Sequence, residues 1–159
     1  MSDRRTWLAK SSTEQTLIAN NIISGRLGAD GTNSRGVVVV GSAGRVWLVN
    51  NTIDSGNAPT DAIALLVDSD STGVASSPTV LNNIFTATST GSATIGVDEG
   101  CGTCDPSRLE SNLFDDGAGV LDTLYRDEGV TSLTAIADVN AMTDIDVTPA
   151  NDAGAPSFA

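Results

Sequence analysis

Pairs of polar amides recur in this chain at a spacing of about 30 residues, a period that is typical of stacked structural repeats. Asn-Asn pairs occupy positions 20–21, 50–51 and 82–83, and a degenerate Ser-Asn pair occupies positions 111–112. Each pair stands inside an otherwise apolar stretch, where an ordinary strand would carry an aliphatic residue. The spacing therefore predicts a solenoid in which each repeat forms one coil.

Apolar residues flank each pair at constant offsets, two positions before its first member and three positions after it. The residues before are Ile18, Leu48, Val80 and Leu109, and the residues after are Ile23, Ile53, Phe85 and Phe114. An upstream strand of period two recurs as well, with Val37 and Val39, Ile63 and Leu65, and Ile95 and Val97 at its alternate positions. Equivalent residues of successive coils would stack at the ~4.8 Å spacing of neighbouring strands. The pattern therefore predicts an all-β fold with continuous apolar ladders inside.

The amide pairs need a structural role, because an unpaired amide inside an apolar stretch is costly. We expect the first member of each pair to point inward at a bend and to bond its equivalents in adjacent coils. The predicted ladder consists of Asn20, Asn50, Asn82 and Ser111. The second member is expected to point outward. Hairpin turns are the alternative, but they favour Asn-Gly and would not fix the apolar offsets over four copies.

The stretches VWLVNNTIDSG, TLIANNIISG and TVLNNIFTAT resemble the coil signature of right-handed parallel β-helix proteins of the pectin-lyase-like superfamily. They are most similar to bacterial surface and secreted members with repeated N-N-x-I motifs. NLFDD at 112–116, ADVNAM and APSFA are similar to the way such proteins end. The resemblance implies a right-handed parallel β-helix of about four coils over residues 1–118, followed by a capping segment and tail over residues 119–159. Because these proteins usually have more coils, the chain is expected to be a C-terminal fragment or a minimal form.

The charge restricts the partners of the protein. The chain has 20 acidic residues, 8 basic residues and no histidine, which gives a formal net charge of −12. Nucleic acids and anionic membranes would be repelled, because phosphate binding needs a basic surface. The lack of histidine excludes Ser-His-Asp and Cys-His catalytic machinery. Cations, neutral glycans and basic proteins remain open as partners.

A Cys-x-x-Cys motif, Cys101 to Cys104, lies in a Gly-rich loop after a predicted strand. Two thiols alone do not complete a tetrahedral zinc site, and neither a histidine nor a second motif is available. We expect a local disulfide that fixes the loop, with free thiols as the alternative. Asp68 and Asp70 faintly resemble a calcium loop, but calcium needs about six to eight oxygen ligands and a solvated turn is the simpler interpretation. No metal or cofactor is predicted, and calcium stays an alternative.

Four carboxylates are candidates for glycan cleavage. Asp68, Asp70, Asp98 and Glu99 follow the upstream strands of adjacent coils, so stacking would bring them together. Paired carboxylates about 5–10 Å apart suit glycoside hydrolysis, and the lyases of the resembled fold combine calcium-binding acids with a basic residue. No arginine or lysine here follows such a pattern, and aromatic residues that would stack on a sugar are only 4% of the chain. A non-catalytic role is therefore the first prediction, and a polysaccharide lyase or glycoside hydrolase is the alternative.

The two ends of the solenoid are expected to differ. Residues 132–142 have apolar positions spaced by three and a Thr or Ser N-cap, which predicts a short helix across the C-terminal coil. Trp7 and Leu8 are the candidates for the upstream strand of the first coil, and no N-terminal cap is evident. An uncovered coil exposes unpaired backbone groups. We therefore expect homo-oligomers that form through the open N-terminal coil.

The predicted function is a structural or binding module of β-helix type, with a glycan as a candidate ligand. The first residues are charged and lack the apolar core of a signal peptide, and the longest apolar runs are too short to span a bilayer. The sequence itself leaves the compartment open. The family resemblance suggests the cell surface or the extracellular space.

Overall fold

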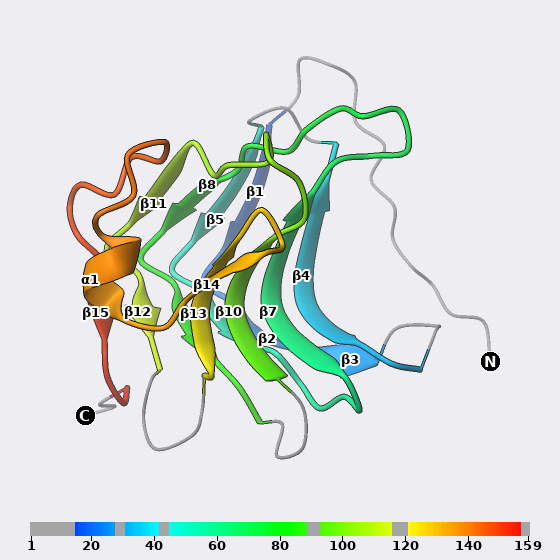
Figure 1. Cartoon of the computed structure of the whole chain (residues 1–159). Coiled ribbons are helices and arrows are strands. Elements are labelled where there is room, and N and C mark those ends of the chain that lie inside the picture. Colours follow the sequence, from blue (N-terminus) through cyan, green and yellow to red (C-terminus); the bar gives the residue numbers. More distant parts are fainter. Residues whose placement is uncertain (1–14, 28–30, 42–44, 89–92, 116–120, 157–159) are drawn as a thin grey trace.

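The computed structural model describes residues 15–27, 31–41, 45–88, 93–115 and 121–156 of the 159-residue chain. The chain forms a right-handed parallel β-helix, as the fold-class prediction states (Figure 1). The four sequence copies supply the four strands of one sheet. About three turns of chain connect these strands, slightly fewer than the predicted coil count.

Three sheets run along the solenoid. Sheet A contains β1 (Thr16–Ala19), β5 (Val46–Val49), β8 (Thr79–Leu81) and β11 (Arg108–Glu110). Sheet B contains β2 (Ile22–Ser24), β6 (Thr52–Asp54), β9 (Ile84–Thr86), β12 (Leu113–Phe114) and β15 (Asp152–Ala153). Sheet C contains β3 (Arg26–Leu27), β4 (Ser34–Val40), β7 (Asp61–Asp68), β10 (Ala93–Glu99), β13 (Thr123–Asp127) and β14 (Thr131–Leu133). A short helix, α1 (Ile136–Val139), follows β14.

The interior is lined by the apolar ladders that the offsets predict. In sheet A, the strand register aligns Ile18, Leu48, Val80 and Leu109. In sheet B, it aligns Ile23, Ile53, Phe85 and Phe114. From the second coil onward these side chains are fully buried, and the rings of Phe85 and Phe114 lie 5.2 Å apart. Burial of each such side chain stabilises the fold by about 1.5–3 kcal/mol, so the ladders contribute substantially to stability.

Each bend between sheets A and B passes through one residue with a left-handed backbone. Asn20, Asn50, Asn82 and Ser111 have φ values of 59°, 55°, 54° and 54°, and their side chains are exposed. Asparagine adopts this conformation more readily than most residues. The prediction that these four residues form an inward ladder is therefore wrong. The left-handed residue shifts the alternation of the strand by one position, so the next side chain points inward.

The inward position belongs to the second member of each pair. The resulting amide row consists of Asn21, Asn51, Asn83, Asn112 and Asn151. Each Nδ2 of the first four donates to Oδ1 of the next member over 3.0–3.1 Å, and each backbone N–H of the first four donates to the same oxygen over 2.9–3.0 Å.

The amide row also satisfies the backbone at the bends. The Nδ2 atoms of Asn51, Asn83 and Asn112 donate to carbonyls of the preceding coil in sheet A, over 2.9–3.0 Å. At the C-terminal end, Asn151 Nδ2 donates to Oδ1 of Asn140 over 3.2 Å. The side-chain amides of Asn51, Asn83 and Asn112, which are buried at three successive bends, therefore bond their neighbours in the row, which offsets the cost of burying them.

The segment after β13 covers the last coil on all three sheets. β14 pairs antiparallel with β13, and β15 pairs parallel with β12. Beside β11, the N–H of Leu109 donates to the carbonyl of Asp146 over 2.8 Å. Figure 1 shows α1 and its flanking chain across this end of the solenoid, and Val139 and Ile145 join the core. The strand edges of the last coil are thus paired.

The helix at this end is shorter than predicted. It comprises Ile136–Val139, while Thr131–Leu133 form β14. The edge of β13 offers hydrogen-bond partners to the incoming backbone, and these compete with a helical turn. The spacing of three between apolar residues predicted the helix, but it carried no information about the neighbouring edge of β13.

At the opposite end, β1, β2 and β3 are the outermost described strands of the three sheets. Two side chains of this first coil point into solvent: Leu17 is 66% exposed and Ile22 is 90% exposed. The predicted strand around Trp7 and Leu8 lies outside the described residues.

Candidate functional site

The predicted carboxylates lie where the strands of sheet C end. Asp68 is the last residue of β7, Asp98 and Glu99 are the last two residues of β10, and Asp70 follows in the loop after β7. Because the strands are parallel, their C-terminal ends lie at the same end of the sheet. Each carboxylate nevertheless has a different environment.

Asp98 is held in an ion pair on the outer face of sheet C. The strand register places Arg126 of β13 beside it, and the guanidinium donates from Nε and Nη2 to the two carboxylate oxygens over 2.7 and 2.6 Å. Arg126 Nη1 also contacts Asp61 at 3.2 Å. The hydrogen bond from the guanidinium to Asp98 raises the pKa of Arg126. Both oxygens of Asp98 are therefore occupied by a two-pronged pair of the strong type.

Glu99 points to the inner face of the same strand and is fully buried. Burial raises its pKa to about 8, and the negative charge of Asp105 adds to the shift. The N–H of Glu128 donates to Oε2 over 3.4 Å, while Oε1 is buried without a partner among the described residues. Burial, followed by the charge of Glu99, also raises the pKa of Tyr125 well above its ordinary value. Glu99 is thus a buried acid that is mostly neutral at pH 7, with its carboxyl group out of reach of solvent.

Asp70 organises the loop that carries it. Its Oδ1 accepts hydrogen bonds from the Thr72 hydroxyl at 2.6 Å, the Thr72 N–H at 2.8 Å and the Val74 N–H at 3.0 Å. The hydrogen bond from the Thr72 side chain is the first cause of the lowered pKa of Asp70. This arrangement is an Asx-type turn in which the side chain replaces a backbone acceptor.

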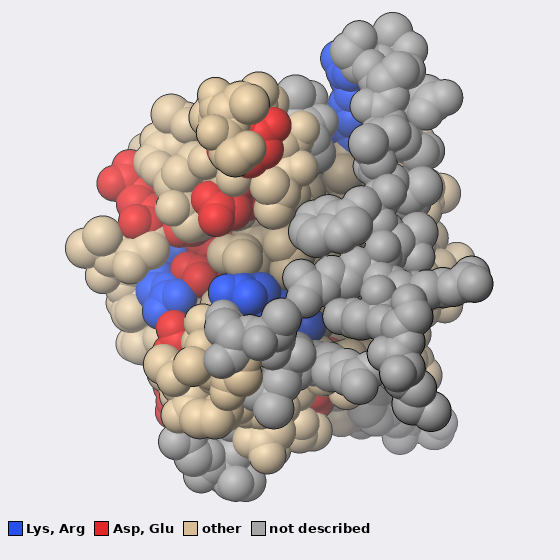
Figure 2. All heavy atoms as spheres, turned by 90° about the vertical axis from the view of Figure 1, so that its right-hand side faces the viewer, with Lys and Arg blue, Asp and Glu red and all other residues tan. Residues whose placement is uncertain are grey.

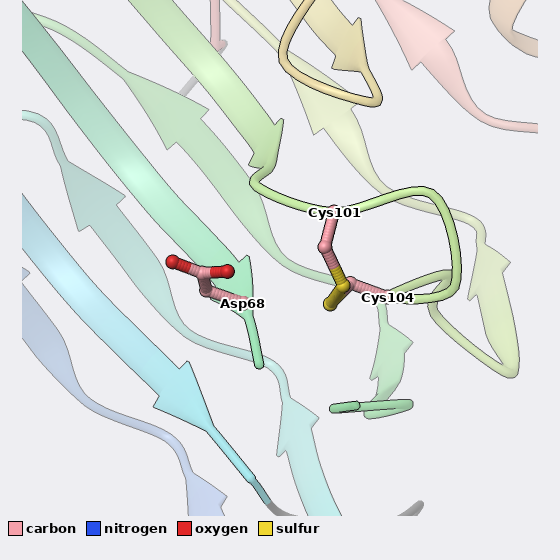
Figure 3. A group of neighbouring side chains, drawn as sticks. All are labelled: Asp68, Cys101 and Cys104. Atoms are coloured by element: carbon pink, nitrogen blue, oxygen red, sulfur yellow. A yellow bond between two sulfur atoms is a disulfide. The ribbon is translucent and has the colours of Figure 1, made fainter. Parts of the chain in front are cut away.

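Asp68 faces the loop that follows β10 in the next coil (Figure 3). That loop is closed by a disulfide between Cys101 and Cys104, whose Cα atoms are 5.2 Å apart. A carboxylate oxygen of Asp68 and the two sulfur atoms lie within 4.8 Å of one another. Within the described part of the chain, this is the group of cysteine and acidic side chains close enough to hold a metal ion, and Asp70 is not part of it.

The four predicted residues therefore have four different sets of partners. Asp98 and Glu99 are neighbours on one strand, so their side chains point to opposite faces of sheet C. Asp98 has an arginine partner, Asp70 caps a turn, and Asp68 lies beside a disulfide. The carboxylates of Asp98 and Glu99 therefore do not face each other.

Two residues of this region were not predicted from the sequence. Arg126 stands 28 residues after Asp98, and the repeat spacing could have placed it in the adjacent strand. Tyr125 lies next to it on the inner face and is buried beside Glu99. Both follow from stacking β13 on β10, but β13 lies beyond the last recognisable amide pair.

The surface seen from the N-terminal end of the solenoid carries acidic side chains along one side, with basic side chains in small groups (Figure 2). The described residues contain no helix that is both long and apolar enough to cross a membrane. Comparisons with known protein families, with curated proteins and with solved structures find no match to this chain.

Proposed function

We propose that this protein is a non-catalytic structural module, a rigid β-helix that presents its surfaces to partners and does not turn over a substrate. The separate engagement of Asp68, Asp70, Asp98 and Glu99 supports this proposal. A catalytic pair needs two carboxylates that share access to one bond. Here Asp98 pairs with an arginine of the neighbouring strand, Asp70 stabilises a turn and Glu99 lies in the interior.

The alternative is a glycan-cleaving enzyme, as the family resemblance suggests. Sugar binding usually requires an accessible aromatic face beside the polar groups. Phe85, Phe114 and Tyr125 are fully buried, whereas Trp47 on the outer face of sheet A is 37% exposed. Among the described aromatic residues, Trp47 is the one that a sugar ring could reach, and it lies on a different sheet from the four carboxylates.

A cleavage screen tests the proposal against this alternative. The purified protein is incubated with polyuronates and neutral polysaccharides, with and without calcium, and new reducing ends and unsaturated products are measured. We expect no turnover above a heat-treated control. Cleavage that the Asp68→Asn variant loses while it keeps its circular dichroism spectrum would establish an enzyme and overturn the proposal.

A further part of the proposal is that two copies associate through their first coils. Leu17 and Ile22 are the exposed apolar residues nearest the outer edges of sheets A and B, and no described strand pairs with those edges. At the C-terminal end β15 pairs with β12 and β14 pairs antiparallel with β13, so the two ends of the solenoid present different surfaces. A head-to-head contact uses the same surface on both copies, and it closes as a dimer.

Light scattering after gel filtration tests this association. We expect a dimer whose population increases with salt, because a net charge of −12 on each copy opposes association. Ile22→Lys should give a monomer. Val130→Lys is the matched control, since Val130 is 83% exposed at the β13–β14 turn near the covered end. A monomeric parent protein, or equal loss in both variants, would remove association through the first coil from the proposal.

A further inference from the structure

The loop that carries the disulfide fits between carboxylates of the two neighbouring coils. A Cβ atom at Gly100 would lie 2.7 Å from Cγ of Asp68, and one at Gly102 would lie 3.0 Å from Oε1 of Glu128. The two glycines flank Cys101, and their lack of side chains lets both carboxylates approach the loop. Asp68 belongs to the coil before the loop and Glu128 to the turn after β13.

The cysteines have the local geometry of a metal-binding turn. The N–H of Cys104 donates to the carbonyl of Cys101 over 2.9 Å, which folds the motif into a tight turn. Two intervening residues between cysteines is a typical spacing in zinc sites. Cys104 is fully buried, while Cys101 and Asp68 are half-buried. The site therefore has a closed inner side and an outer side that solvent can reach.

We propose that reduction of the Cys101–Cys104 disulfide opens a cation site, in which both thiolates and the Asp68 carboxylate bind a thiophilic divalent ion such as zinc. A water molecule takes the fourth position from the solvent side. The sequence supplied only two ligands for such a site, and the stacking of β10 on β7 supplies the third.

The distances suit this ion after a small rearrangement. Zinc binds sulfur at about 2.3 Å and carboxylate oxygen at about 2.0–2.2 Å, so tetrahedral ligand atoms are about 3.5–3.8 Å apart. The carboxylate oxygen and both sulfurs already lie within 4.8 Å of one another. The oxygen needs to move by no more than about 1 Å, while the sulfurs separate once their bond is broken.

The reaction balances with a dithiol as reductant. The dithiol transfers two electrons and two protons to the protein disulfide, which becomes two thiols, while the dithiol becomes a cyclic disulfide. Zinc then displaces the two thiol protons, which pass to the buffer. The disulfide and the metal exclude each other, because both use the same two sulfur atoms.

The surrounding charge favours a cation over an anion at this place. The chain has a net charge of −12, and Glu128 approaches the loop from the side opposite Asp68. Glu128 is too far from the other ligand atoms to belong to the group of three, but its charge lies next to the loop. An electronegative surface raises the local concentration of cations.

Cadmium titration of the reduced protein tests the site, because cadmium–thiolate bonds absorb in the ultraviolet. The protein is reduced with excess dithiol, desalted under anaerobic conditions, and titrated with cadmium or zinc alone. We expect one cadmium per chain, a thiolate absorption band that excess zinc reduces by competition, and no band with the oxidised protein. Equal binding by the oxidised protein would overturn the proposal.

Variants separate this site from unspecific thiol binding. In Asp68→Asn the amide oxygen can still accept the 2.7 Å hydrogen bond from the Ser69 N–H, so the fold should persist. We expect its cadmium affinity to fall about tenfold or more while the thiolate band remains. Asp138→Asn, which changes an exposed carboxylate on α1, should bind like the parent protein. Equal affinities for the parent protein and Asp68→Asn would refute the role of Asp68.

Folding of the reduced protein is checked by circular dichroism before and after addition of zinc. We expect the β-sheet spectrum to persist on reduction, because the disulfide closes a loop of only four residues. A spectrum that is lost on reduction and that zinc does not restore would overturn the proposal, since no site would then exist in the reduced chain.

Discussion

The buried carboxyl group of Glu99 should make the stability of this protein fall as pH rises through neutrality. Burial raises its pKa from 4.5 to about 8 in the folded protein. Between these values the folded state keeps a proton on Glu99 that the unfolded state has released. Because the folded state then binds more protons, the free energy of unfolding decreases with increasing pH over this interval. Above about pH 8 the decrease should level off.

The magnitude follows from the size of the pKa shift. Each pH unit inside the interval costs at most about 1.4 kcal/mol, because one proton is released on unfolding. Between about pH 5.5 and pH 8.5 the expected loss is therefore about 3 kcal/mol. The charged groups around Glu99 are Asp105, Asp127 and Glu128, and Tyr125 is the neutral titratable group beside it.

The composition of the chain makes this effect unusually easy to isolate. There is no histidine, and both cysteines are in the disulfide and do not titrate. Urea unfolding followed by far-ultraviolet circular dichroism at several pH values gives the free energy of unfolding directly. Glu99→Gln, which stays neutral, should lose the decline and be more stable than the parent protein above pH 8. Asp138→Asn, an exposed change on α1, should keep the decline.

Two results would refute this reasoning. A parent protein whose stability is constant over the window would show that Glu99 is ionised in the folded state at little cost. A decline of equal size in Glu99→Gln would show that another group takes up the proton.

Three further predictions concern the coils. Asn83→Leu should lower the free energy of unfolding by at least about 3 kcal/mol in urea titrations, because it leaves buried amide groups of the row unpaired. Asn82→Ala, one residue earlier on the exposed bend, should lower it by only about 1 kcal/mol, because alanine adopts the left-handed backbone less readily. Equal losses in the two variants would contradict the assignment of the inward residue. Gly96→Ala should destabilise by about 1–3 kcal/mol and lower the melting temperature, since its Cβ would lie 2.6 Å from a backbone oxygen of β13; an unchanged melting temperature would argue against this close approach. Arg126→Met should cost about 2 kcal/mol by leaving the nearly buried Asp98 without its partner, and Asp98→Leu added to it should recover part of that loss in a double-mutant cycle.

The strands and their inward faces could be predicted because they depend on local alternation and on a constant period. The positions of Leu48 and Ile53 are apolar in every copy of the repeat. In a solenoid, equivalent positions of neighbouring coils lie side by side, as Leu48 does with Ile18 and Ile53 does with Ile23. The choice between Asn50 and Asn51 could not be predicted in the same way. Alternation from Leu48 places Asn50 inward, but its left-handed backbone reverses the direction of the next side chain.

The candidate site depended even more on three-dimensional placement. The repeat spacing predicted that Asp68, Asp98 and Glu99 lie near one another, and all three are at the C-terminal ends of neighbouring parallel strands. The sequence reasoning did not predict that the adjacent side chains of β10 point to opposite faces of the sheet. It also did not predict that Arg126 lies beside Asp98. The partner strand β13 carries no amide pair that would have identified its register.

By itself, the sequence determined the period of the solenoid, the apolar rows that fill it, the positions of its bends and a net charge of −12. These properties follow from residue type and spacing, which the chain carries locally. Only the tertiary structure decided which amide of each pair is buried, how the C-terminal segment completes the three sheets, and that Asp68 meets the Cys101–Cys104 loop. Those outcomes depend on contacts between coils, where residues far apart in the sequence lie one strand spacing apart and the direction of each bend sets which side chains meet.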